Sequence, residues 1–330
     1  MISDSTTSIK NNYAVVTRAK TAELNSNVMH NDKAELITSK NKKEISKDEK
    51  LAIGLGLISL AAVGAALILG KKIDNAQTSK VCKKYLENIE VLREHFNTIF
   101  NKNYTNDEAN EIALKYQEAF KEKDNLQFLT KLFKQLNKDY ELPLKTAQSE
   151  TSVELGESVY GKFNVIRGIK GNGNLTNAGM SFNSDKLLKD FDRKKLTQTF
   201  AHELKHAQQA KIAIGVNKRL FIEHQAKQNL HHIWYQDALR ARGGNPKAAL
   251  DDYINKIEST LLLPEFRNIE KIENNSPLYQ RGINYIENLK NYKKADGTPD
   301  GYNAYKNQLV EREAFDVGDR FIEIYELLTK

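Results

Sequence analysis

The chain has 330 residues, 40% of them hydrophobic and 28% charged, which is enough for a well-buried core and excludes a collagen-like or wholly disordered protein. The single cysteine, Cys82, excludes an intramolecular disulfide framework and a cysteine-rich zinc module. Lys and Arg total 50 against 43 Asp and Glu, a mild net charge of +7 with no arginine-rich block, so we expect no nucleic-acid partner.

Residues 1–50 are rich in Ser, Thr, Asn and Lys and contain few large apolar side chains. This composition cannot bury enough surface to offset the entropy lost on ordering, so we expect a disordered tail. The next segment, residues 51–70, is LAIGLGLISLAAVGAALILG and carries no charge. A helix of this length spans roughly 30 Å of hydrocarbon at about 1.5 Å per residue.

Residues 51–70 fit either a buried core helix or a membrane-spanning helix. Apolar residues occupy every face of such a helix and lysines flank both ends, which favours a single-pass transmembrane anchor. A cleavable signal peptide is not expected, because a long polar segment precedes the apolar one. Lysines are balanced on the two sides, so the sequence leaves the orientation in the membrane open.

Residues 71–150 follow the anchor and show helical periodicity. Apolar residues recur three or four positions apart, and the capping-box pair Thr105 and Glu108 predicts the start of a second helix. We expect a helical region from these patterns. The apolar positions that carry the first helix are Val81, Tyr85, Ile89, Leu92, Phe96 and Ile99.

Residues 151–330 begin with the most convincing strand material of the chain. Short apolar runs lead to the alternating segment GMSFN at residues 179–183. Helices return from about residue 190. Asn245 and Pro246 predict the start of one of them, as its N-cap and its first helical residue, and the last helix is expected over residues 302–328. The chain is therefore predicted to be α+β, mainly helical, with a small sheet.

The segment LTQTFAHELKHAQQA contains the motif His202-Glu203-Leu204-Lys205-His206. Positions four apart lie one turn above each other on a helix, so the two imidazoles can hold one metal ion together. Glu203 is rotated by about 100° from His202, beside that face, where a carboxylate can accept a proton from water at the metal. The apolar residues of the helix occupy a different sector: Leu196, Phe200, Leu204 and Ala207.

Three elements in this order resemble the zincin metallopeptidases. The GMSFN segment resembles the edge strand that lies above the metal-binding helix, and His202 to His206 matches the HExxH motif on that helix. Downstream, the segment from Gln308 to Asp316 resembles the Glu-x-x-Ala segment of gluzincin-type enzymes, which supplies a glutamate ligand. The resemblance covers residues 155–330 and implies a small zincin-like sheet packed on an HExxH active-site helix.

This resemblance implies one zinc ion bound by His202, His206 and Glu311, with Glu203 as the general base. One departure leaves the third ligand open. The family often places an Asp directly after the Ala of the downstream segment, whereas this chain has Phe315 there and Asp316 one position later. Glu313 therefore stays an alternative to Glu311.

The function predicted from these features is that of a membrane-anchored zinc metallopeptidase that hydrolyses a peptide or protein substrate. Two imidazoles and one carboxylate leave a zinc ion an open position for water, whose pKa falls to roughly 7. The alternative is a non-catalytic, membrane-anchored helical interaction protein, in which the helical region is the working part. Zinc content of the purified protein separates the two.

Overall fold

The computed structural model describes residues 75–329 apart from the gaps 151–159, 168–178, 190–191 and 295–296. The predicted tail and the predicted anchor at residues 51–70 lie outside these described residues. In the part of the chain that is described, no helix has the length and hydrophobicity needed to cross a bilayer. The described residues are mainly helical with one three-stranded sheet, which confirms the expected α+β, mainly helical class.

The sheet has the strand order β1-β3-β2, so its central strand is the last one in sequence. β3 (Gly179–Asn183) is parallel to β1 (Ala147–Glu150) and antiparallel to β2 (Gly161–Asn164). The GMSFN segment therefore forms the central strand, which corrects its expected place at the edge. All of its residues are buried, including the polar ones, because Ser181 donates to Glu150 at 2.8 Å and Asn183 accepts from the N–H of Asp185 at 3.0 Å.

α9 (Arg193–Lys227) carries the HELKH motif and is the longest helix among the described residues. Asp192 caps the first turn of α9 by accepting from the N–H of Lys195. The predicted apolar stripe of α9 is fully buried. The helix breaks at Asn217, where φ and ψ are −155° and 88°. The side chain of Asn217 accepts from the N–H of Leu220 and so caps the helical segment that follows the break.

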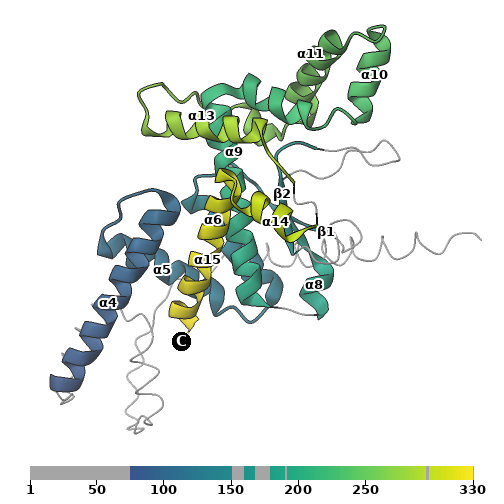
Figure 1. Ribbon diagram of the computed structural model, residues 1–330. Helices are drawn as coiled ribbons and strands as arrows, with labels where there is room; N and C mark the ends of the chain where they lie inside the picture. Colours follow the sequence, from purple (N-terminus) through teal and green to yellow (C-terminus); the bar gives the residue numbers. More distant parts are fainter. Residues whose placement is uncertain (1–74, 151–159, 168–178, 190–191, 295–296, 330) are drawn as a thin grey trace, which may run out of the picture. The chain divides into compact units, whose positions relative to one another are not determined.

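Two later helices pack on α9. α15 (Leu309–Thr329) lies alongside its first half, and α13 (Pro277–Lys290) crosses it near the break (Figure 1). The single terminal helix expected over residues 302–328 is in fact two, because α14 (Pro299–Lys306) ends before α15 begins. The two helix crossings depend on glycines. A Cβ on Gly282 would lie 2.5 Å from Val216, and one on Gly318 would lie 3.1 Å from the main chain of Gln198.

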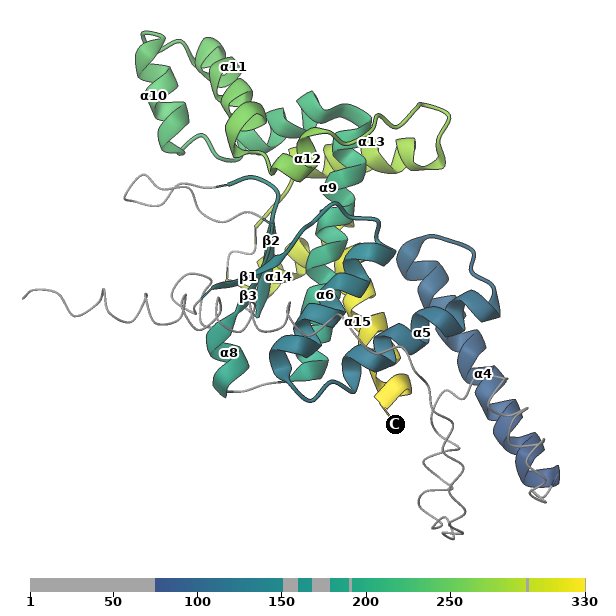
Figure 2. The ribbon, with the colours of Figure 1, turned by 180° about the vertical axis from the view of Figure 1, so that it is seen from behind.

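Three helices lie in the region predicted to be helical, α4 (Asn75–Phe100), α5 (Asn106–Phe120) and α6 (Asn125–Asp139), but its last four residues form strand β1. α5 begins with the expected capping box of Thr105 and Glu108. α4 and α5 pack against α15 (Figure 2). Aromatic rings form part of this contact, and the ring centroid of Phe321 lies 6.2 Å from that of Phe100 and 5.3 Å from that of Tyr116. β1 also pairs with β3 across residue 150, so the described parts of regions 71–150 and 151–330 share one hydrophobic core.

A further helical section follows α9. It contains α10 (Ile233–Ala241), α11 (Pro246–Lys256), the π-helical turn η1 (Ile257–Leu261) and the short helix α12 (Pro264–Arg267). α11 begins as predicted, with Asn245 as its cap and Pro246 in its first turn. The segment after β2 pairs with the end of this section, because the N–H of Arg167 donates to Leu261 and that of Leu263 donates to Val165.

We expect Gly318→Val to lower the free energy of unfolding by about 1 to 3 kcal/mol, because the new side chain forces α15 away from the main chain of Gln198. Urea titration followed by circular dichroism measures this change. Arg312→Val is the matched control, since Arg312 is exposed on the same helix. Equal stability of the two variants would contradict the close crossing.

Candidate metal centre

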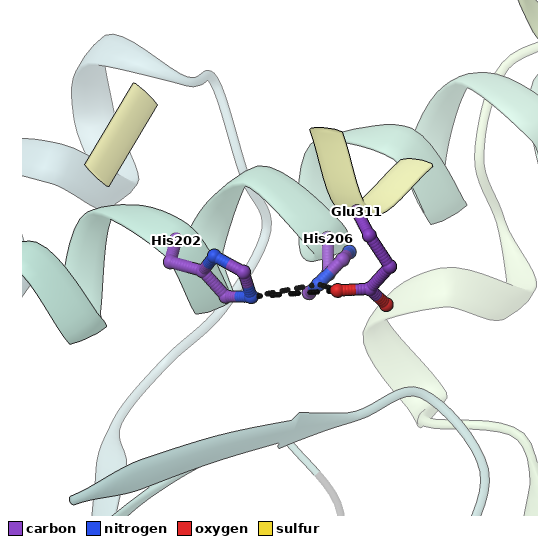
Figure 3. Close-up of side chains that lie close together, drawn as sticks. All are labelled: His202, His206 and Glu311. Atoms are coloured by element: carbon purple, nitrogen blue, oxygen red, sulfur yellow. Dashed lines mark hydrogen bonds and ion pairs between the residues drawn. The ribbon is translucent and has the colours of Figure 1, made fainter. Parts of the chain in front are cut away.

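Three predicted ligand residues lie together between α9 and α15. The Nε2 atoms of His202 and His206 are 3.2 Å apart, and Glu311 Oε2 lies 3.8 Å from the first and 3.5 Å from the second. Figure 3 shows the three side chains converging from the two helices. The helical spacing places the histidines on one face of α9, and the packing of α15 brings the glutamate to it. These atoms form a group that can hold a metal ion.

The spacing of the donor atoms fits a small divalent cation. Four ligands at about 2.1 Å in a tetrahedron are roughly 3.4 Å from one another, close to the three distances observed. Glu311 is only 2% exposed, and its Oε2 is buried with no hydrogen-bond partner among the described residues. An unpaired buried carboxylate oxygen is costly, so its position near two imidazole nitrogens suits it to bind a cation.

The histidines are held by contacts away from their Nε2 atoms. Nδ1 of His206 lies 2.9 Å from Oε1 of Gln209, and because that oxygen is an acceptor, Nδ1 carries a proton and Nε2 faces Glu311. Burial opposes a charge on His206, but the hydrogen bond and the negative charge of Glu311 outweigh it and raise the pKa of this ring. A bound metal ion would replace the proton on Nε2. His202 hydrogen-bonds to the main chain of Ala314. Burial, followed by the charge of His206, lowers the pKa of His202 to about 3, so this ring is neutral at pH 7. Neutral imidazoles are the form that binds metal.

Glu311 is oriented by two tyrosines. The hydroxyl of Tyr292 donates to Glu311 Oε1 at 2.7 Å, and Tyr305 from α14 also hydrogen-bonds to this carboxylate. Burial opposes the negative charge of Glu311, but His206 and the two hydroxyls outweigh it and lower the pKa to about 2. The carboxylate is therefore ionised at pH 7, with one oxygen held and the other directed at the histidines.

Glu203 lies beside the group and is not one of its donors. Its Oε2 accepts from the N–H of Phe163 in β2 at 2.9 Å, so the strand at this edge of the sheet fixes the carboxylate. Burial raises the pKa of Glu203 to about 7, although the charge of His206 opposes the shift. Glu203 can therefore exchange a proton near neutral pH.

Glu313, the alternative third ligand, lies in a different polar cluster. Its Oε2 accepts from Tyr285 at 2.6 Å and from Arg281 at 3.1 Å, and Nζ of the buried Lys205 is 3.8 Å away. Among the described residues it is absent from the group of donor atoms around the histidines. The structure thus brings Glu311, and not Glu313, to the two histidines.

Sequence reasoning missed Gln209, Tyr292 and Tyr305. Gln209 has a detectable signal, since it lies one helical turn after His206, where an amide can reach the ring. The tyrosines have none, because Tyr292 follows α13 and Tyr305 belongs to α14, and only the tertiary fold brings them to Glu311.

Two imidazoles and one carboxylate are a donor set typical of catalytic zinc, and they also suit other first-row divalent metals. No protein-family model matches the chain, and neither the curated proteins nor the solved structures contain a significant match to it. The chemistry of the centre is therefore argued from the residues that surround it.

We expect Glu311→Gln to lower zinc affinity by at least about a hundredfold, because an amide oxygen replaces an ionised ligand. Glu313→Gln is the matched control. It should retain zinc but lower the free energy of unfolding by about 1 to 3 kcal/mol, since Arg281 and Lys205 lose their counter-charge. Competition with a zinc chelator and urea titration measure the two effects. The opposite order of affinities would assign the ligand to Glu313.

Tyr292→Phe should weaken zinc binding about tenfold, because Glu311 Oε1 loses the donor that orients it. Tyr302→Phe removes a hydroxyl from an exposed tyrosine of α14 and should leave the affinity unchanged. The same chelator competition compares them. Unchanged affinity in Tyr292→Phe would show that the hydroxyl does not position the carboxylate.

Proposed function

We propose that the protein is a membrane-anchored zinc metallopeptidase of the gluzincin type. The observation that carries this proposal is the buried, unpartnered Oε2 of Glu311 between two histidines, with a fourth protonatable group beside them. His202, His206 and Glu311 would hold the zinc ion. When bound, zinc supplies a Lewis acid that polarises a carbonyl and lowers the pKa of water to roughly 7.

Glu203 is suited to the proton transfers of peptide hydrolysis. A carboxylate whose pKa lies near 7 can accept a proton from the attacking water and then donate it to the leaving amine nitrogen. The main-chain N–H of Phe163 holds the carboxylate while it does so. General acid–base catalysis of this kind contributes about 10² to 10⁴ in rate.

The surroundings of the centre support a peptide as the substrate. A cavity of about 600 Å³ is lined by His206, Glu311 and the segment 162–167, which contains most of β2. The Phe163 N–H is directed away from β3, since it donates to Glu203. An extended peptide can therefore lie in the cavity beside β2, on the side where Phe163 holds Glu203.

The membrane part of the proposal rests on the apolar segment 51–70 and its flanking lysines. A single anchor would hold the catalytic region near one surface of the bilayer. Substrates would then be peptides or proteins that reach that surface.

Glu203→Gln should retain zinc and lower hydrolysis of fluorescein-labelled casein at least a hundredfold, because an amide cannot accept the proton of water. His202→Ala should lose both zinc and activity. Zinc content and cleavage rate are measured on the same preparations.

Glu118→Gln is the matched control for this experiment, since Glu118 is exposed on α5. It should behave as the unaltered protein. Full activity of Glu203→Gln would refute the mechanism. A zinc-free, inactive unaltered protein would favour the non-catalytic, membrane-anchored interaction protein.

A further inference from the structure

The charged side chains that line the cavity beside the candidate metal centre are mainly positive. Three cationic residues line it: Lys162 in β2, Arg167 after β2, and Lys294 after α13. Among its described lining residues, the one carboxylate is Glu311, which the metal would engage. A bound dication would add to the positive charge, so the cavity attracts anionic groups.

None of the three cations forms an ion pair within the described part of the chain, whereas Lys205 and Arg281 near the centre are both paired with Glu313. Lys162 and Lys294 are exposed, and Arg167 is partly exposed. Their charges are therefore available to a ligand in the cavity.

The three cations lie at different distances along the chain from the residues that hold Glu203 and Glu311, and these distances indicate where a bound peptide would carry acidic side chains. Lys162 directly precedes Phe163, which holds Glu203. Lys294 follows Tyr292, which holds Glu311, by two residues, a reach of about 7 Å. Arg167 lies four residues beyond Phe163, at most about 14 Å along the strand.

We propose that this cavity selects peptide segments that carry Asp or Glu within about four residues of the cleaved bond. The inference rests on the proposed function and names its substrate class. Lys162 and Lys294 lie within two residues of Phe163 and Tyr292, which hold Glu203 and Glu311, so acidic side chains near the bond are favoured. Arg167 accommodates another farther along the chain. The remaining polar wall, formed by side-chain amides, offers donors and acceptors to a peptide backbone and comprises Asn164, Gln225, Gln228 and Asn229.

The observations favour a peptide over a nucleic acid. A volume of about 600 Å³ accommodates a few residues of a peptide, and its buried wall includes the apolar side chains of Phe221 and Ile257. Nucleic-acid sites instead spread basic residues over an open surface or groove that follows the phosphate backbone.

Binding tests this inference separately from hydrolysis. Three labelled ten-residue peptides share one Ala/Gly frame and carry four Glu, four Gln or four Lys at the same positions. Their affinities for zinc-loaded, full-length Glu203→Gln protein in detergent are measured by fluorescence anisotropy. We expect the Glu peptide to bind about tenfold more tightly than the Gln peptide at 50 mM NaCl, with the difference largely lost at 500 mM.

The combined variant Lys162→Gln, Arg167→Gln and Lys294→Gln, made in the same background, should remove this preference. The matched control is Lys115→Gln, Lys247→Gln and Arg93→Gln, which makes the same charge change away from the cavity and should keep the preference. Equal affinity for the Glu and Gln peptides would overturn the inference. So would a loss of preference in the control, or displacement of the Glu peptide by an equal concentration of a ten-nucleotide oligothymidylate.

The inference and the proposed function fail in different ways. If the unaltered protein cleaves casein with zinc but the three peptides bind alike, only the acidic preference is wrong. If the Glu peptide binds through the three cations but no zinc-dependent cleavage occurs, the acidic cavity is supported and the metallopeptidase proposal is overturned.

Discussion

The packing of α15 against α9 is the contact on which the metal centre depends. The two histidines come from one turn of α9, but the glutamate is more than a hundred residues away in sequence. Gly318 lets the helices approach so closely that a Cβ there would lie 3.7 Å from the Cβ of His202. The aromatic contacts of Phe321 with α4 and α5 hold the other end of α15. The positions of the three donor side chains therefore depend on how firmly α9 and α15 are packed together.

Glu311 shows how the fold tolerates a buried carboxylate. A polar group removed from water without a partner costs about 1 to 3 kcal/mol. Two tyrosines partner this carboxylate, and Oε2 remains directed at the histidines. A cation at that point would remove the remaining cost, so metal binding and folding stability are coupled at this residue. The same coupling explains why residues that contact no metal are expected to change zinc affinity.

Local patterns predicted much of the fold. The capping box at Thr105, the cap at Asn245 and the apolar stripe of α9 are all found where the sequence placed them, because each depends on neighbours within one or two turns. The sheet order was not predictable from alternation, since GMSFN has polar residues that are buried and paired with Glu150 and the start of α8 (Ser184–Lys189). The two tyrosines and the cationic cavity were also missed, because distant segments form them.

Helix geometry explains why Glu311, and not Glu313, faces the two histidines. Residues two apart on a helix are about 200° apart, so one faces the histidines while the other faces Arg281 and Tyr285 of α13. Tyr285 also lines the cavity, as does Gln209, which bridges His206 and the main chain of Val310. Gln209 and Tyr285, which link α9 and α13 to α15 around the candidate metal centre, therefore also form part of the cavity wall.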